Sequence, residues 1–170
     1  AEETEEIIAV ASYIESSELN ASPIDVISAE EFKNLRVSTV AELSKYLGIA
    51  SGSHFQTNAL DGVDQGMATI TLRGLDHAST LVLINKKRQT HSGTPSDEGE
   101  GYIDINVIPE IALERIEILK DGATSLYGSD AIAGVINFQT YQQFDGMRFL
   151  LGSQKTSNYD QRDNTLGVLF

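Results

Sequence analysis

The chain has 170 residues, 41% of them hydrophobic, which is enough for the core of one domain. It contains no cysteine, and this excludes a disulfide framework, a thiolate metal site and a cysteine nucleophile. The formal net charge of −13 argues against nucleic-acid binding, because an acidic chain repels a phosphate backbone.

The start of the chain is acidic and has no lysine or arginine before Lys33. Residues 1–22 are predicted to form an extended, mobile lead with one apolar patch at residues 7–11. Pro23 then precedes a short apolar run, which predicts a strand over residues 24–27.

Two short helices are expected next. Ser28 and Glu31 have the spacing of a capping box, in which each side chain bonds a backbone N–H of the other residue, and this predicts a helix over residues 29–35. A threonine and a glutamate repeat that spacing and predict an amphipathic helix over residues 39–47, ended by a glycine. Both helices are interpreted as packing elements.

The middle of the chain alternates between long polar loops and strands. The polar stretches at residues 48–67 and 89–101 have no periodicity, and loops of this length are often functional. Alternating apolar residues predict a half-buried strand over residues 68–73. A continuous apolar run predicts a central strand over residues 81–84, followed by a turn at residues 85–87.

A proline predicts a short turn of helix over residues 109–113. Alternation predicts a strand over residues 115–119, with its isoleucines inward and Arg115 and Glu117 on the opposite, polar phase. A further strand is expected over residues 135–138.

The last part of the chain, from Gly146, contains two alternating segments joined by a polar linker, which predicts a β-hairpin. Such alternation also occurs in the strands of transmembrane barrels. The chain stops on an apolar strand at Phe170, where backbone groups and side chains would lack cover, so a truncated chain is expected.

No residue pattern indicates an enzyme, a metal or a cofactor. The histidines at 54, 77 and 91 share no metal-ligand spacing. The glycine-rich stretch at residues 122–134 precedes a strand, whereas phosphate-binding loops follow one and open a helix. No GxSxG nucleophile motif is present.

The run IPEIALERIEILKDGATSLYGSDAIAGVINFQT, residues 108–140, closely resembles the signature segment of TonB-dependent receptor plugs. The segments SPIDVISAEEFKN, TVAELSKYLGI, ATITLRGL and TLVLINKKR resemble other parts of that domain, so the resemblance covers residues 5–170. One departure is at the hairpin, where the family has Asp-Gly or Asn-Gly and this chain has Asn85-Lys86. Lysine is disfavoured at a position of positive φ, so the turn type is left open. Leu47-Gly48 stands where the family often has Pro-Gly.

The resemblance implies an α+β fold: a small mixed β-sheet with short flanking helices and long apical loops, followed by the start of a β-barrel. It divides the chain into a lead at residues 1–22 with a candidate TonB box, a plug domain at residues 23–143, and incomplete first barrel strands at residues 144–170. It implies an outer-membrane receptor whose plug lies inside the barrel with its N-terminus facing the periplasm. Such a receptor binds a scarce ligand, such as an iron-siderophore, cobalamin or a glycan, and gates its energy-coupled uptake.

The resemblance also implies a contact with the TonB C-terminal domain, because a short β-prone strip in a polar lead suits strand addition. The residues expected to make it are Glu6, Ile7, Ile8, Ala9 and Val10. A first plug strand or an inert tail remains an alternative.

Two arginines, Arg73 and Arg115, match family arginines that lie toward carboxylates of the barrel wall. Glu114 and Glu117 could pair with them locally instead.

Ligand contacts are expected in the two long loops, where aromatic and amide side chains can stack and orient a ligand. The candidates are His54, Phe55, Gln56, His91 and Tyr102. The alternative function is a free-standing periplasmic interaction module, which would use the plug fold to bind TonB or another partner without transport.

Overall fold

A computed structural model describes residues 24–35, 37, 39–53, 67–93, 95–96, 99–155 and 162–170. Its strands are β1 Ile24–Ser28, β2 Thr80–Ile84, β3 Lys87–Arg88, β4 Leu113–Leu119, β5 Gly134–Thr140, β6 Arg148–Lys155 and β7 Arg162–Leu169. Its α-helices are α1 Ala29–Asn34 and α2 Thr124–Tyr127, and its 3₁₀ segments are η1 Val40–Lys45, η2 His77–Ser79, η3 Ile105–Val107, η4 Glu110–Ala112 and η5 Ser129–Ala131.

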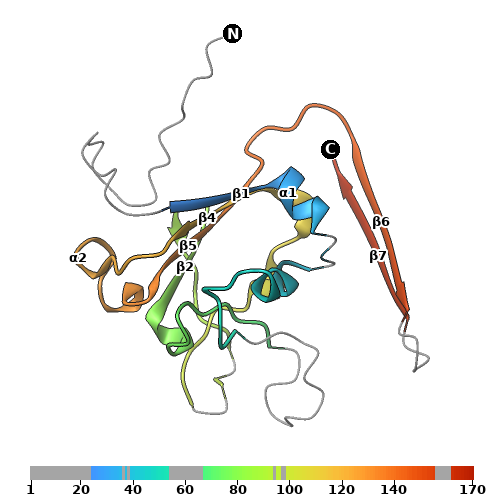
Figure 1. Cartoon of the computed structure of the whole chain (residues 1–170). Helices are drawn as coiled ribbons and strands as arrows, with labels where there is room; N and C mark the ends of the chain where they lie inside the picture. The colour runs from blue at the N-terminus through green and yellow to red at the C-terminus, as the bar shows by residue number, and fades with distance from the viewer. Residues whose placement is uncertain are drawn as a thin grey trace.

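Five strands form a mixed sheet in the order β1-β4-β5-β2-β3, and β6 and β7 form a separate hairpin (Figure 1). Only the pairing of β2 with β5 is parallel among the described strands. The expected α+β fold with a small mixed sheet and short helices is therefore confirmed.

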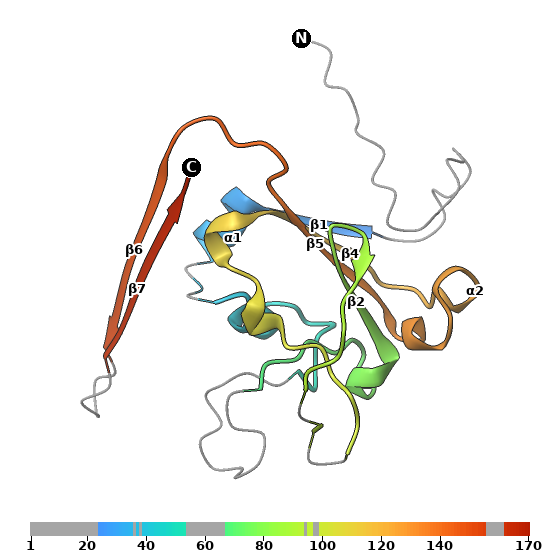
Figure 2. The same cartoon turned by 180° about the vertical axis from the view of Figure 1, so that it is seen from behind.

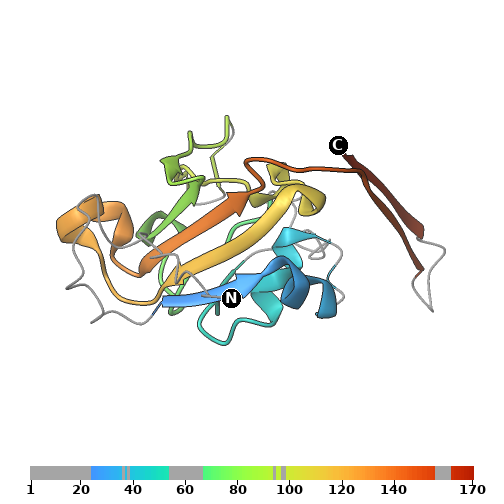
Figure 3. The same cartoon turned by 90° about the horizontal axis from the view of Figure 1, so that it is seen from above.

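Both faces of the central strands are covered. The larger core lies on the face of Ile116, Ile118 and Phe138 and includes α1, η1 and the segment around Ile70. The smaller core lies on the other face, where strands β2, β4 and β5 contribute to a cluster that includes Ala131 of η5. Figures 2 and 3 show α2 and η5 at one end of the sheet, and α1 and the β6–β7 hairpin toward the other end.

The predicted capping box at the start of α1 is confirmed. The Ser28 N–H donates to Glu31 Oε2 at 2.8 Å, and the Glu31 N–H donates to Ser28 Oγ at 3.2 Å. The backbone hydrogen bond from Ser28 holds the pKa of Glu31 below its usual value. This local pair explains why a helix of only six residues begins at a defined position.

The second predicted helix has a different geometry from the expected amphipathic α-helix. Thr39 Oγ1 accepts a hydrogen bond from the Glu42 N–H at 3.3 Å, as the spacing predicted. The helix that follows, η1, is a 3₁₀-helix and ends before Tyr46. Because side chains three residues apart eclipse each other in this geometry, Val40 and Leu43 share the buried face.

The strand predicted over residues 68–73 is absent, although residues 68–72 are buried. Its backbone is satisfied outside the sheet: the Thr71 N–H donates to Ser53 Oγ at 2.9 Å, and the Leu72 N–H donates to Thr80 Oγ1 at 3.0 Å. Both Ile70 and Thr71 are 2% exposed, so the expected half-buried pattern is also wrong.

The turn between β2 and β3 has positive φ at both central residues, 52° for Asn85 and 64° for Lys86, as a type I′ hairpin turn requires. The lysine at position 86 therefore does not prevent a type I′ turn. The surrounding contacts hold it: the Lys86 N–H donates to Asn137 Oδ1 at 2.8 Å, and Asn85 Oδ1 accepts the Thr140 N–H at 2.9 Å.

The predicted hairpin after Gly146 is confirmed as β6 and β7, which pair antiparallel from Arg148↔Leu169 onward. In the part of the chain that the structure describes, no helix has the length and apolar character needed to cross a membrane.

Candidate functional site

The predicted site residues divide into two groups. Those expected to bind TonB, residues 6–10, and the first loop candidates, residues 54–56, lie outside the described residues. His91 and Tyr102 are described, and both line a cavity of about 110 Å³ between β2, η2 and the segments that flank the second loop.

Tyr102 is 8% exposed and is part of the wall of this cavity. Its ring lies edge-on to His77, with the ring centroids 6.3 Å apart. Its carbonyl accepts the Ser92 N–H at 2.7 Å, so the two ends of the second loop are tied together. His91 is exposed and packs beside Gly101, where an added Cβ would come within 2.5 Å of His91 Nδ1.

Next to this cavity, Asp76, His77 and Glu100 form a cluster that sequence spacing did not indicate. One donor atom from each lies within 4.8 Å of the other two. The cluster forms because Asp76 is the N-cap of η2 and Glu100 is brought across from the end of the second loop. A hydrogen bond with the Glu100 side chain is the main cause that lowers the pKa of Asp76.

A second polar group crosses the sheet. Glu117 is fully buried at 0% exposure and accepts hydrogen bonds from Arg115 Nε and Asn137 Nδ2, both at 2.9 Å. Asn137 in turn accepts the Lys86 N–H, so a hydrogen-bonded chain runs from Arg115 to the β2–β3 turn. The expected outward polar phase of β4 is therefore wrong for Glu117, because a second layer covers that face.

The other predicted barrel-contact residues have partners within the chain. Arg115 also lies 3.8 Å from Glu114, on the exposed side of the strand. Arg73 is not on a strand but in a turn with φ 61°, and its Nη2 bonds the Lys120 carbonyl and lies 3.2 Å from Asp121 Oδ1. The sequence left open whether the arginines pair locally with Glu114 and Glu117. The structure shows this local pairing for Arg115 with Glu117.

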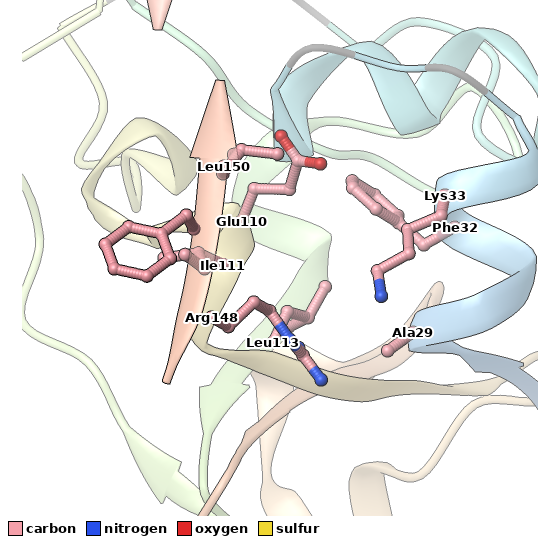
Figure 4. A pocket seen from close by; sticks show the side chains of 9 residues that line it. Ala29, Phe32, Lys33, Glu110, Ile111, Leu113, Arg148 and Leu150 are labelled. Carbon is pink, nitrogen blue, oxygen red and sulfur yellow. The ribbon is translucent and has the colours of Figure 1, made fainter. Parts of the chain in front are cut away.

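A groove separates the sheet domain from the hairpin. Figure 4 shows Phe32 and Lys33 of α1, Glu110 of η4, and Arg148 and Leu150 of β6 around a cavity of about 100 Å³. Burial is the main cause that raises the pKa of Glu110.

The side of the hairpin that faces the sheet domain includes Arg148, Leu150 and Gly167. An added Cβ on Gly167 would lie 3.2 Å from Ile111 Cδ1, so η4 contacts β7 closely at this glycine. Arg148 donates to the Tyr141 hydroxyl at 3.2 Å and stacks on the Tyr141 and Phe144 rings, at 4.9 and 5.0 Å from the centroids. The opposite face is apolar and exposed, with Phe149 at 64% and Leu151 at 80%.

Comparison with known proteins places this fold in a family. The family model described as TonB-dependent Receptor Plug Domain matches residues 17–135. The chain is 33% identical over 145 residues to the iron-regulated outer membrane virulence protein of Vibrio cholerae, covering 82% of this chain and 21% of the relative. It is 34% identical over 128 residues to the vitamin B12 transporter BtuB of Vibrio vulnificus, covering 75% of this chain and 18% of that protein.

Among solved structures, the siderophore receptor PirA from Acinetobacter baumannii matches with a TM-score of 0.59 and 26% identity, covering 85% of this chain and 21% of that one. The chain belongs to the TonB-dependent receptor plug family, whose members are non-enzymatic transport proteins. It spans about a fifth of the length of these relatives.

Proposed function

We propose that the chain is the plug of a TonB-dependent outer-membrane receptor that binds a scarce ligand and gates its uptake into the periplasm. The observation that supports this role beyond family membership is the orientation of the β6–β7 hairpin. Its Gly167 side packs on η4, whereas Phe149, Leu151 and Leu166 point away and are at least 64% exposed. A barrel strand has this asymmetry, because one face meets the plug and the other meets lipid.

Residues 144–170 would then be the first strands of the surrounding barrel, and residues 23–143 the plug. Arg148 fits this arrangement, since it lies on the plug-facing side and is held by the Tyr141 hydroxyl. The remaining barrel-contact candidates, Arg73 and Glu114, are partly exposed and could meet carboxylates or basic groups of the barrel wall.

The ligand class is proposed from the relatives and from the second loop. The relatives' names refer to iron regulation, vitamin B12 and ferric enterobactin, so an iron-siderophore or cobalamin is the leading expectation, with a glycan as a further candidate. His91 and Tyr102 line one cavity and provide an imidazole and a phenol near the loop. Together with residues 54–56 they are the proposed ligand contacts.

Energy coupling is proposed to act through residues 6–10, which would add as a strand to the TonB C-terminal domain. The N-terminus would face the periplasm. A pull on this segment reaches the sheet through β1, an edge strand paired only with β4 among the described strands.

The proposal is tested in cells that carry the complete natural gene. Uptake of radiolabelled ferric enterobactin and cyanocobalamin is measured with the gene intact, with the gene deleted, and with only residues 5–11 removed. We expect uptake of one probe or a related siderophore to require both the gene and residues 5–11. A gene that ends at Phe170, or unchanged uptake of every probe after gene deletion, would refute the transport function.

A second candidate is a free-standing periplasmic module that binds TonB without transport. It is favoured by one observation: Arg73 and Arg115 already have carboxylate partners within the chain, so the plug fold does not need a barrel wall to neutralise them. Tight binding of the TonB C-terminal domain by a naturally short protein that supports no uptake would select this function.

A further inference from the structure

We propose that Asp76, His77 and Glu100 form a binding site for a divalent transition-metal ion such as Zn²⁺. The inference is independent of the proposed transport, because it concerns residues within the chain alone. The donor atoms come from two segments, the start of η2 and the end of the second loop, and all lie within 4.8 Å of one another.

The histidine at the centre of the site is oriented for metal binding. His77 Nδ1 lies 3.1 Å from Asp76 Oδ1, so this nitrogen carries the proton and Nε2 presents its lone pair. Nε2 is buried and has no hydrogen-bond partner among the described residues. An imidazole held by a carboxylate in this way is the usual arrangement of a metal-binding histidine.

Glu100 provides the second ligand. Its Oε2 lies 3.9 Å from His77 Nε2, which is too long for a hydrogen bond. Two ligands at about 2.1 Å from one tetrahedral ion are about 3.4 Å apart, so a shift of about 0.5 Å in the flexible Glu100 side chain closes the site. Asp76 can either orient His77 or ligate the ion through its carboxylate.

An independent observation comes from Thr69, which lines the same cavity. Thr69 is 2% exposed, yet its hydroxyl has no hydrogen-bond partner within the described part of the chain. A buried hydroxyl without a partner costs free energy. The cavity that Thr69 and His77 line holds about 110 Å³, enough for a metal-bound water that would bond this hydroxyl.

The charges around the site favour a cation. Asp76 and Glu100 place two carboxyl groups beside one imidazole, a set of acidic oxygen and nitrogen donors suited to a cation. The positive charge of Arg88 in the cavity wall is paired with Asp130 of the same wall, since Arg88 Nη1 lies 2.6 Å from Asp130 Oδ2. Imidazole together with carboxylate selects Zn²⁺ and neighbouring transition metals over Ca²⁺ and Mg²⁺, which prefer sets of oxygen ligands.

Binding would join the end of the second loop to η2. Glu100 lies at the end of the second loop. Within this loop the Ser96 N–H already donates to the Glu100 carbonyl at 2.9 Å. A metal that bridges Glu100 and His77 would fix this loop against the sheet, in the region where ligand contacts are proposed.

The test is titration of the untagged chain with ZnCl₂ by isothermal calorimetry, with CoCl₂ absorbance as a second readout. We expect one ion per chain, a visible Co²⁺ band, and a Kd at least tenfold weaker in His77→Gln and in Glu100→Gln. The carboxylate control, Glu30→Gln on the exposed side of α1, should bind as the unmodified chain does.

The Glu100 variant keeps the test valid if His77→Gln fails to fold, because the Glu100 side chain is 43% exposed. Absence of Zn²⁺ binding by the folded chain would overturn the proposal. So would Zn²⁺ binding by both site variants as tight as that of the unmodified chain, which would place the ion elsewhere. Equally tight binding of Mg²⁺ would exclude the assigned class of metal. None of these results depends on TonB or on uptake.

Discussion

The Asn137 side chain donates a hydrogen bond to the carboxylate of Glu117 over a distance of 2.9 Å, between residues that face each other across β4 and β5. The same amide accepts the Lys86 N–H at 2.8 Å. One side chain thus connects a buried charge in the middle of the sheet to the turn at its edge, and both ends can be tested by substitution.

Glu117→Ala is expected to lower the free energy of unfolding by about 2–4 kcal/mol, because it leaves the Asn137 amide and the Arg115 guanidinium without their buried partner. Urea unfolding followed by circular dichroism measures the effect. Glu114→Ala, on the same strand but with a 38% exposed side chain, is the matched control and should change stability by less than about 0.5 kcal/mol. Equal losses for the two variants would contradict the importance of the buried network.

The β2–β3 turn offers two neighbouring substitutions with opposite expected signs. Lys86→Gly should stabilise the chain by about 0.5–1 kcal/mol, because φ is 64° and only the backbone N–H of Lys86 is used in the bond to Asn137. Asn85→Gly should destabilise it despite a similar φ of 52°, because the Asn85 side chain bonds the Thr140 backbone and hydroxyl. Thermal unfolding of both variants decides whether φ or the side-chain bonds dominate; a gain in both would show that the Asn85 bonds contribute little.

Sequence patterns correctly predicted the elements that are determined by residues close together in the chain. The Ser28–Glu31 capping box and the apolar run of β2 are visible in the sequence because adjacent residues determine them. Alternation also predicted the β6–β7 hairpin, since the two faces of an isolated hairpin meet different surroundings.

Alternation gave wrong predictions where both faces of a segment are buried. Residues 68–73 alternate as a strand does, but their backbone partners are side chains such as Ser53 and Thr80, which no periodicity reveals. Glu117 is in the polar phase of β4, and the second layer over that face buries it. The cluster of His77 with Glu100 depends on the path of the second loop, so histidine spacing could not have found it.

A glycine at the start of β5 gives a test of close packing. Gly134 has φ 145°, and an added Cβ would lie 2.4 Å from the Leu119 carbonyl and 2.7 Å from Leu72 Cδ1. Gly134→Ala is therefore expected to cost about 3 kcal/mol or more, because strain and a backbone clash act together. Gly128→Ala has φ 84° but nothing within 4 Å, so it should show the cost of the backbone conformation alone, about 1–2 kcal/mol. Similar losses in chemical denaturation would mean that β5 moves to relieve the clash.

The groove beside the hairpin gives a pH-dependent prediction. Burial, followed by repulsion from Glu42, raises the pKa of Glu110 above its usual 4.5, and Lys33 partly opposes the rise. A carboxyl whose pKa is raised on folding favours the folded state only while it is protonated. Its contribution is therefore fully present below pH 4.5 and is lost as the pH rises through the folded value.

Glu110→Gln, which stays neutral, should consequently be more stable than the unmodified chain at pH 7, and the difference should shrink toward pH 4. Unfolding in urea at both pH values measures this difference. Lys33→Ala is the reverse probe: without the opposing charge, the pKa of Glu110 should rise further and the chain should lose stability at pH 7. A Glu110→Gln gain that is the same at pH 4 and pH 7 would show that packing in the groove, and not ionisation of Glu110, sets its effect on stability.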